Sequence, residues 1–132
     1  MDVPNIPHSF KKPVGDNESL WRRIYNNPNF PQYKPDDKGG YRVSSAAFKD
    51  RNNELSVDIA SKTTIDKCLA GPPRGDALAS IKAKIPKGFG YPVIEDPLPN
   101  NPAHALIKGK IKRSHTKLLA KACQWVVEPR FT

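Results

Sequence analysis

The 132-residue chain lacks most of the features that assign a protein to a function class. Its two cysteines, Cys68 and Cys123, show no zinc-site spacing, and its three histidines are too dispersed to predict a metal. We expect two free, buried thiols, although the sequence leaves a disulfide between them open. No apolar run approaches the ~20 residues that span a bilayer. Residues 1–5 show no basic region followed by an apolar one, so we expect no secretory signal and a cytoplasmic protein.

Common catalytic and cofactor motifs are absent as well. The segment Gly88–Tyr91 lacks the third glycine and the following helix of a phosphate-binding loop. No Gly-x-Ser-x-Gly sequence occurs, which leaves serine chemistry a remote option. We therefore expect no cofactor and no metal.

Acidic residues are missing from one long stretch, residues 97–127. The whole chain has 22 Lys and Arg against 13 Asp and Glu, a net charge of +9. Such a charge favours an anionic partner, either nucleic acid or an acidic protein surface. The candidate binding residues are the basic ones of this stretch together with an early arginine pair: Lys108, Lys110, Lys112, Arg113, Lys117, Lys121, Arg22 and Arg23.

The basic stretch has two possible arrangements. If residues 107–111 are extended, Lys108, Lys110 and Lys112 share one face and lead to a helix that starts at Ser114. A helix N-terminus also favours anions, so this arrangement would suit phosphates. Alternatively, the lysines form a solvated sheet edge that resists aggregation.

Hydrophobic periodicity predicts an α+β fold. The central tract is Tyr41–Phe48 followed by Glu54–Ile59, which we expect to form a hairpin in the sheet core. Further strands are expected at residues 19–25, 78–85, 91–95 and 103–107, with short helices competing at 16–25 and 75–84. Helices are expected at residues 61–71 and 114–127, and 86–90 is expected to turn.

The length suits a single domain. We expect residues 1–15 to form an extended proline-rich arm, because Pro4, Pro7 and Pro13 each remove a backbone donor. This arm would lie across the domain or dock on a partner subunit, and disorder of the segment is an equal alternative. Residues 16–132 would form one α+β domain, a small mainly antiparallel sheet with the C-terminal amphipathic helix packed on one face.

One scattered polar set is a candidate for catalysis: His104, Arg42, Ser44 and Ser45. Histidine acts as a general acid or base near neutral pH, and arginine stabilises a developing oxyanion or phosphorane. If these groups meet in one cleft, they would suit a small metal-free, ribonuclease-like enzyme. The alternative is structural: the serines bond the backbone at a strand start, and a carbonyl satisfies His104.

Four short tracts carry a resemblance to a set of short uncharacterised bacterial proteins: Leu20–Arg23, Arg42–Phe48, Leu55–Asp58 and Asn101–Ala105. That resemblance implies a bacterial or phage origin and supplies no activity.

A second resemblance begins at Arg22 or Arg23 and continues through Gly39–Arg42. This order is similar to the opening of RES-type toxins, which have an ADP-ribosyltransferase-like fold and consume NAD. The segment with phenylalanine and asparagine that follows in those toxins is missing here. Only Glu54 and Asp58 stand near the position of their acidic residue.

The sequence therefore favours a small basic binding module or accessory subunit for an anionic partner. The alternative is a small metal-free enzyme, either ribonuclease-like or an NAD-consuming ADP-ribosyltransferase-like toxin.

Overall fold

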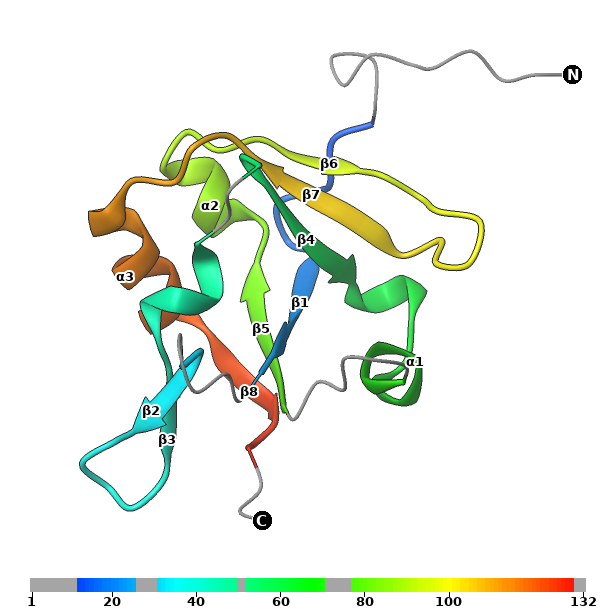
Figure 1. The fold of residues 1–132 in the computed structure, drawn as a ribbon. Coiled ribbons are helices and arrows are strands. Elements are labelled where there is room, and N and C mark those ends of the chain that lie inside the picture. Colours follow the sequence, from blue (N-terminus) through cyan, green and yellow to red (C-terminus); the bar gives the residue numbers. More distant parts are fainter. Residues whose placement is uncertain (1–11, 26–30, 50–51, 71–76, 130–132) are drawn as a thin grey trace, which may run out of the picture.

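The computed structural model describes residues 12–25, 31–49, 52–70 and 77–129, and it has the expected α+β fold (Figure 1). Its main feature is a six-stranded sheet in the order β6-β7-β4-β1-β5-β8, in which every neighbouring pair is antiparallel. The strands are β1 (Ser19–Ile24), β4 (Glu54–Ile59), β5 (Ala77–Lys82), β6 (Val93–Glu95), β7 (His104–Lys108) and β8 (Gln124–Val127). A separate hairpin joins β2 (Tyr33–Pro35) to β3 (Tyr41–Val43).

The helices are short except for one. They are α1 (Ile65–Leu69), α2 (Lys84–Gly88) and α3 (Arg113–Ala122), with the 3-10 helices η2 (Ser45–Phe48) and η3 (Ala60–Lys62). The C-terminal helix α3 packs on one face of the sheet and contacts η2 and β3 (Figure 1). Helix α1 lies away from this group, beyond the end of β4.

The hydrophobic core lies between the sheet and the layer of α3 and η2. Alternation along β4 directs Leu55, Val57 and Ile59 inward, and all three are buried. Phe48 of η2 and Leu119 of α3 are fully buried in the same cluster. Because each such side chain contributes about 1.5–3 kcal/mol on burial, this layer holds η2 and α3 against the sheet.

The predicted hairpin at residues 41–59 is only half correct. Strand β4 forms as expected, but β3 ends at Val43 and pairs with β2 instead. The buried Ser44 ends the strand, because its Oγ accepts a hydrogen bond from the Ala46 N–H and caps η2. The chain then turns as a 3-10 helix, which buries Ala47 and Phe48.

The predicted helix at residues 114–127 is too long. Helix α3 ends at Ala122, Cys123 is extended, and the next four residues form the edge strand β8. Trp125 and Val127 pair with Ala79 and Leu78 of β5. The β-branched and aromatic residues suit a strand, and pairing outweighs the helical spacing of the apolar residues.

Two further segments differ from expectation. The strand at 78–85 is shorter than predicted, because β5 ends at Lys82 and residues 84–88, partly expected as a turn, form α2. Pro86 is tolerated there, since it lies in the first helical turn. The helix expected at 61–71 is restricted to α1, where Thr64 Oγ1 accepts from the Lys67 N–H as the N-cap.

The end of the expected N-terminal arm belongs to the sheet. Val14 donates to Val93 O at 2.9 Å, and Glu95 donates to Lys12 O at 2.8 Å, so this segment covers the outer edge of β6. Val14 is buried in the core cluster. Residues 1–11 of the arm lie outside the described residues. Within the described part of the chain, no helix has the length and apolarity needed to cross a membrane.

Candidate functional site

A broad groove runs between the β2–β3 hairpin and the layer of α3 and β8. Its volume is about 1150 Å³. Its basic lining residues are Lys34, Arg42, Lys117 and Lys121, and its apolar ones include Val43, Leu118 and Trp125. Glu128 is the one carboxylate that lines it within the described residues.

The hairpin wall of the groove is held by its own turn and by the sheet. Asp36 Oδ1 accepts from the N–H groups of Lys38 and Gly40, at 2.9 and 2.8 Å. These bonds stabilise the carboxylate and lower the pKa of Asp36. Trp125 Nε1 donates to Tyr41 O at 2.9 Å, which fastens β3 to β8 across the groove floor.

The helical wall is anchored at the start of α3. The Tyr91 hydroxyl accepts from the Lys112 N–H at 2.9 Å and lies 2.6 Å from His115 Nδ1. The His115 ring stacks on Phe89 of the α2 end, with centroids 4.7 Å apart. These contacts fix the start of α3, so the basic residues along it are presented on a rigid element.

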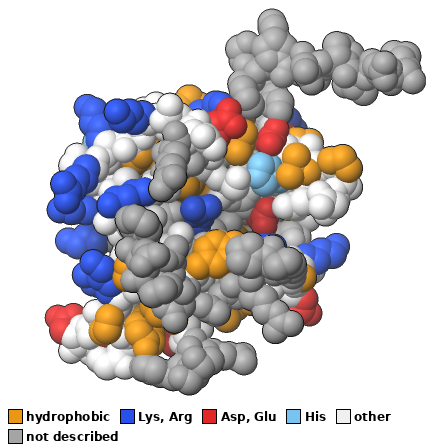
Figure 2. All heavy atoms as spheres, in the orientation of Figure 1, with side chains coloured by type: hydrophobic (Ala, Val, Ile, Leu, Met, Phe, Trp, Pro, Cys, Tyr) orange, Lys and Arg blue, Asp and Glu red, His pale blue; other side chains and the backbone are white. Residues whose placement is uncertain are grey.

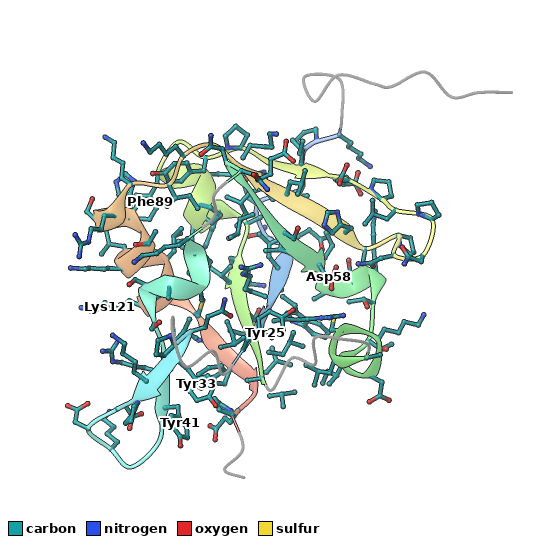
Figure 3. The ribbon with its side chains drawn as sticks, viewed as in Figure 1. Tyr25, Tyr33, Tyr41, Asp58, Phe89 and Lys121 are labelled. Atoms are coloured by element: carbon teal, nitrogen blue, oxygen red, sulfur yellow. The ribbon has the colours of Figure 1, made fainter. Side chains whose placement is uncertain are left out.

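The exposed side of α3 is strongly basic. Arg113, Lys117 and Lys121 follow one another at one turn each and are all exposed. Lysine and arginine side chains gather on this side of the molecule (Figure 2). Lys121 points away from the helix there, and Tyr33 and Tyr41 lie beside each other on the hairpin (Figure 3).

The predicted lysine row does not form. Lys108 lies opposite Glu54 in the β4–β7 ladder and forms an ion pair with it. Gly109, with φ +105°, then ends the extended alternation that would have placed Lys108 and Lys110 on one face. Lys110 and Lys112 are exposed and precede α3.

A second, smaller pocket of about 180 Å³ lies on the sheet face that points away from the core cluster. Its wall includes His104 of β7, with Ser56 and Asp58 of β4. Antiparallel register places Asp58 directly opposite His104, and alternation brings Ser56 to the same face. This pocket is lined by Trp21, Arg22, Arg23, Tyr25, Ser56, Val57, Asp58, Asn101 and His104.

His104 connects Ser56 of this pocket to Asp96, which lies outside the pocket lining. Its Nδ1 lies 3.0 Å from Asp96 Oδ2 and 3.0 Å from Asp96 O, and its Nε2 lies 3.1 Å from Ser56 Oγ. The His104 and Asp96 side chains are only 13% and 17% exposed, whereas Ser56 is exposed. The sequence analysis missed both Ser56 and Asp96. A signal for Ser56 was its place on the polar face of β4, two residues before Asp58.

The predicted catalytic set does not come together. Arg42, Ser44 and Ser45 line the groove, while His104 lines the smaller pocket, and the two linings share no residue. Ser44 is 2% exposed and donates to Pro31 O, which matches the structural alternative. In Figure 3, Asp58 of the pocket and Lys121 of the groove lie at separate parts of the molecule.

The arginine pair lines the pocket and not the groove. Arg22 Nε donates to Ala47 O and its NH1 group donates to Ser56 O, both at 2.9 Å. Arg23 NH2 donates to Ala70 O at 3.2 Å. Of the predicted binding residues, therefore, only Lys117 and Lys121 line the groove itself.

Both cysteines are free thiols. Burial raises the pKa of Cys68 to about 11, and its Sγ lies 3.3 Å from Asp58 Oδ2. Burial likewise raises the pKa of Cys123 to about 12. Thiols held protonated in this way are poor nucleophiles. Among the described residues, no group of three or more potential metal ligands occurs.

Comparisons with known proteins add no relative: no protein-family model, curated protein or solved structure matches the chain.

Proposed function

We propose that the protein binds single-stranded nucleic acid along the groove between the β2–β3 hairpin and α3. The observation that carries this proposal is the lining of the groove, where four basic side chains surround an aromatic and aliphatic floor. Proteins that bind single strands combine a positively charged groove with apolar and aromatic surfaces for the bases.

The charge pattern favours a repeating polyanion. Lys117 and Lys121 lie one helical turn apart on one wall, and Lys34 and Arg42 lie opposite each other in the hairpin ladder on the other wall. Arg113 extends the helical row toward the start of α3. Two facing rows of cations suit a chain of phosphates better than a single anionic group.

The groove floor adds apolar and aromatic surface to the basic walls. Leu118 is 46% exposed, although it is a large apolar side chain on α3. The half-buried indole of Trp125 lies nearby in the same lining, held by its bond to Tyr41 O. The bases of a single strand stack on such surfaces, whereas an acidic peptide has no bases that would use them.

Fluorescence anisotropy with a labelled single-stranded oligonucleotide tests the proposal. Binding should weaken as salt rises from about 50 to 200 mM, with a slope of log K against log salt near −3 if about four phosphates are contacted. The variant Lys121→Glu should weaken binding at least about tenfold. Lys67→Glu is the matched control, because it makes the same charge change on α1, outside the groove lining.

Two results would overturn this function. One is equal loss of affinity in Lys121→Glu and Lys67→Glu, which would mean that only net charge matters. The other is binding of an acidic polypeptide, such as polyglutamate, with no binding of the oligonucleotide at low salt. That second outcome would assign the groove to an acidic protein partner.

A further inference from the structure

The smaller pocket carries a separate activity that does not depend on the groove. We propose that Ser56, His104 and Asp96 form a serine nucleophile site that hydrolyses small carboxylic esters. Ser56 is the nucleophile, His104 the general base, and Asp96 the positioning residue that orients the imidazole.

The hydrogen bonds run in the order that such a site requires. Ser56 Oγ lies 3.1 Å from His104 Nε2, and Asp96 Oδ2 lies 3.0 Å from His104 Nδ1. Both distances fall within the range of about 2.6–3.2 Å expected for a nucleophile, its base and the group that orients the base. The three residues come from β4, β7 and the segment just after β6, so chain topology and not local sequence brings them together.

The surroundings of His104 select the useful tautomer. Its Nδ1 faces two acceptors of one residue, the Asp96 carboxylate and the Asp96 carbonyl, both at 3.0 Å. The ring proton therefore lies on Nδ1, because a carboxylate and a carbonyl oxygen both accept hydrogen bonds and neither donates one. Nε2 is left with its lone pair directed at Ser56 Oγ, where it accepts the hydroxyl proton.

Ser56 is also accessible. The residue is exposed, while the His104 and Asp96 side chains are largely shielded from water. The Ser56 backbone carbonyl is held by Arg22 NH1 at 2.9 Å, which fixes the strand that presents the hydroxyl. A positioned base, a rigid strand and an open nucleophile are the elements that a covalent hydrolytic mechanism needs.

The pocket limits the substrate class. Its volume of about 180 Å³ is that of about six water molecules at ~30 Å³ each, enough for a short acyl group. Trp21 and Tyr25 supply an apolar wall. The Asp58 carboxylate accepts from Asn101 Nδ2 at 2.7 Å and lies 3.3 Å from Cys68 Sγ, and it offsets part of the positive charge of Arg22 and Arg23 in the same lining. These features favour a neutral short-chain ester.

The reaction proceeds in two balanced halves. Ser56 Oγ attacks the ester carbonyl carbon while its proton passes to His104 Nε2, and the C–O bond to the alcohol then breaks. The alcohol leaves with the proton from Nε2, and the acyl group stays on Oγ. Water then gives its proton to Nε2 and attacks the acyl carbon; Ser56 recovers that proton, and the carboxylic acid is released.

Arg23 provides charge for the intermediate. Its guanidinium lines the pocket and bonds Ala70 O through NH2, while a guanidinium has further N–H donors. The oxyanion that forms on the ester carbonyl would be stabilised by this positive group.

The test uses the full chain, the chromogenic ester p-nitrophenyl acetate and a fluorophosphonate probe. The probe should label one serine, mapped to Ser56 by peptide mass analysis. Ser56→Ala should abolish labelling and reduce ester hydrolysis at least about 100-fold, and His104→Gln should do the same. Ser61→Ala is the matched control, because this serine is exposed on η3 and lines a different pocket.

The variant Asp96→Asn distinguishes a role of Asp96 in positioning the His104 ring from a role in folding. An amide donor facing Nδ1 favours the wrong tautomer, so kcat should fall with KM unchanged, while the circular dichroism spectrum and the melting temperature stay near those of the parent. Three outcomes would overturn the inference: no labelling of the folded parent, labelling that survives in Ser56→Ala, or hydrolysis equal in the parent and Ser56→Ala. Any of them would leave the three residues as a static cross-strand network.

Discussion

Arg22 of β1 bridges to the backbone of β4, where its NH1 group donates to Ser56 O at 2.9 Å. The β1–β4 ladder pairs only Leu20 with Ile59 and Trp21 with Asp58, so the two strands separate beyond that point. The guanidinium also donates through Nε to Ala47 O at 2.9 Å. One side chain therefore satisfies two carbonyls that no strand partner reaches, and it ties η2 to the sheet.

Replacing this arginine should weaken the whole fold. Arg22→Met keeps much of the side-chain volume but leaves both carbonyls without their charged donor, which should lower the free energy of unfolding by about 2–4 kcal/mol. Arg23→Met is the matched control, since Arg23 makes one exposed bond of 3.2 Å to Ala70 O and should cost less than about 1 kcal/mol. Urea unfolding followed by tryptophan fluorescence measures both values. Equal losses would contradict the bridging role of Arg22.

Ser44 should matter for stability and Ser45 should not. The Ser44 hydroxyl is buried, donates to Pro31 O and accepts from the Ala46 N–H at 3.3 Å. Ser44→Ala removes the cap of η2 and the hydrogen bond to the Pro31 carbonyl, so the free energy of unfolding should fall by about 1–3 kcal/mol. Ser45→Ala, at the adjacent half-buried position, should change it by about 0.5 kcal/mol or less. A larger loss for Ser45→Ala in the same urea titration would refute this assignment.

These residues show where sequence reasoning succeeds and where it stops. Alternation identified β4, because Leu55, Val57 and Ile59 repeat at the strand period and all point to the core. The same reasoning wrongly extended the predicted C-terminal helix into β8, because Trp125 also fits the apolar stripe of a helix. Pairing with β5 makes this segment a strand. Local pattern specifies which face is apolar, but it does not specify the strand partner.

The two functional sites were likewise predictable from the sequence only in part. The basic character of α3 was readable directly, since Lys117 and Lys121 lie in a segment without acids. Their groove was not, because its opposite wall comes from β2 and β3, about eighty residues earlier in the chain. His104 was singled out for its chemistry, yet its partners Ser56 and Asp96 depend on the register between β4 and β7 and on the turn after β6.

Gly109 is a position where an added methyl group should be costly. Its φ is +105°, and a Cβ there would lie 3.4 Å from Tyr91 Cδ1. Gly109→Ala should destabilise the fold by about 1–3 kcal/mol through backbone strain. Gly88→Ala is the control, because nothing lies within 4 Å of its Cβ position and its φ is not in the left-handed region. That variant should be neutral or slightly stabilising, and thermal unfolding distinguishes the two. Equal melting temperatures would show that the turn after β7 tolerates a side chain.

The two thiols should make stability fall at high pH. Burial raises the pKa of Cys68 to about 11 and that of Cys123 to about 12, above the ordinary value of 9.0. Between about pH 9 and these values the unfolded chain has lost the thiol protons and the folded chain has kept them. The folded state then binds more protons, so the stability that the neutral thiols contribute is complete below pH 9 and is lost as pH rises through the folded values.

The measurement is urea unfolding at pH 8 and at pH 10.5, for the parent and for a Cys68→Ala, Cys123→Ala double variant. Between these two pH values the parent should lose more stability than the double variant. The difference between the two losses isolates the thiols, because the other groups are common to both proteins. Identical pH dependence in the two proteins would mean that the thiols ionise in the folded state as readily as in the unfolded chain, and that burial does not hold their protons.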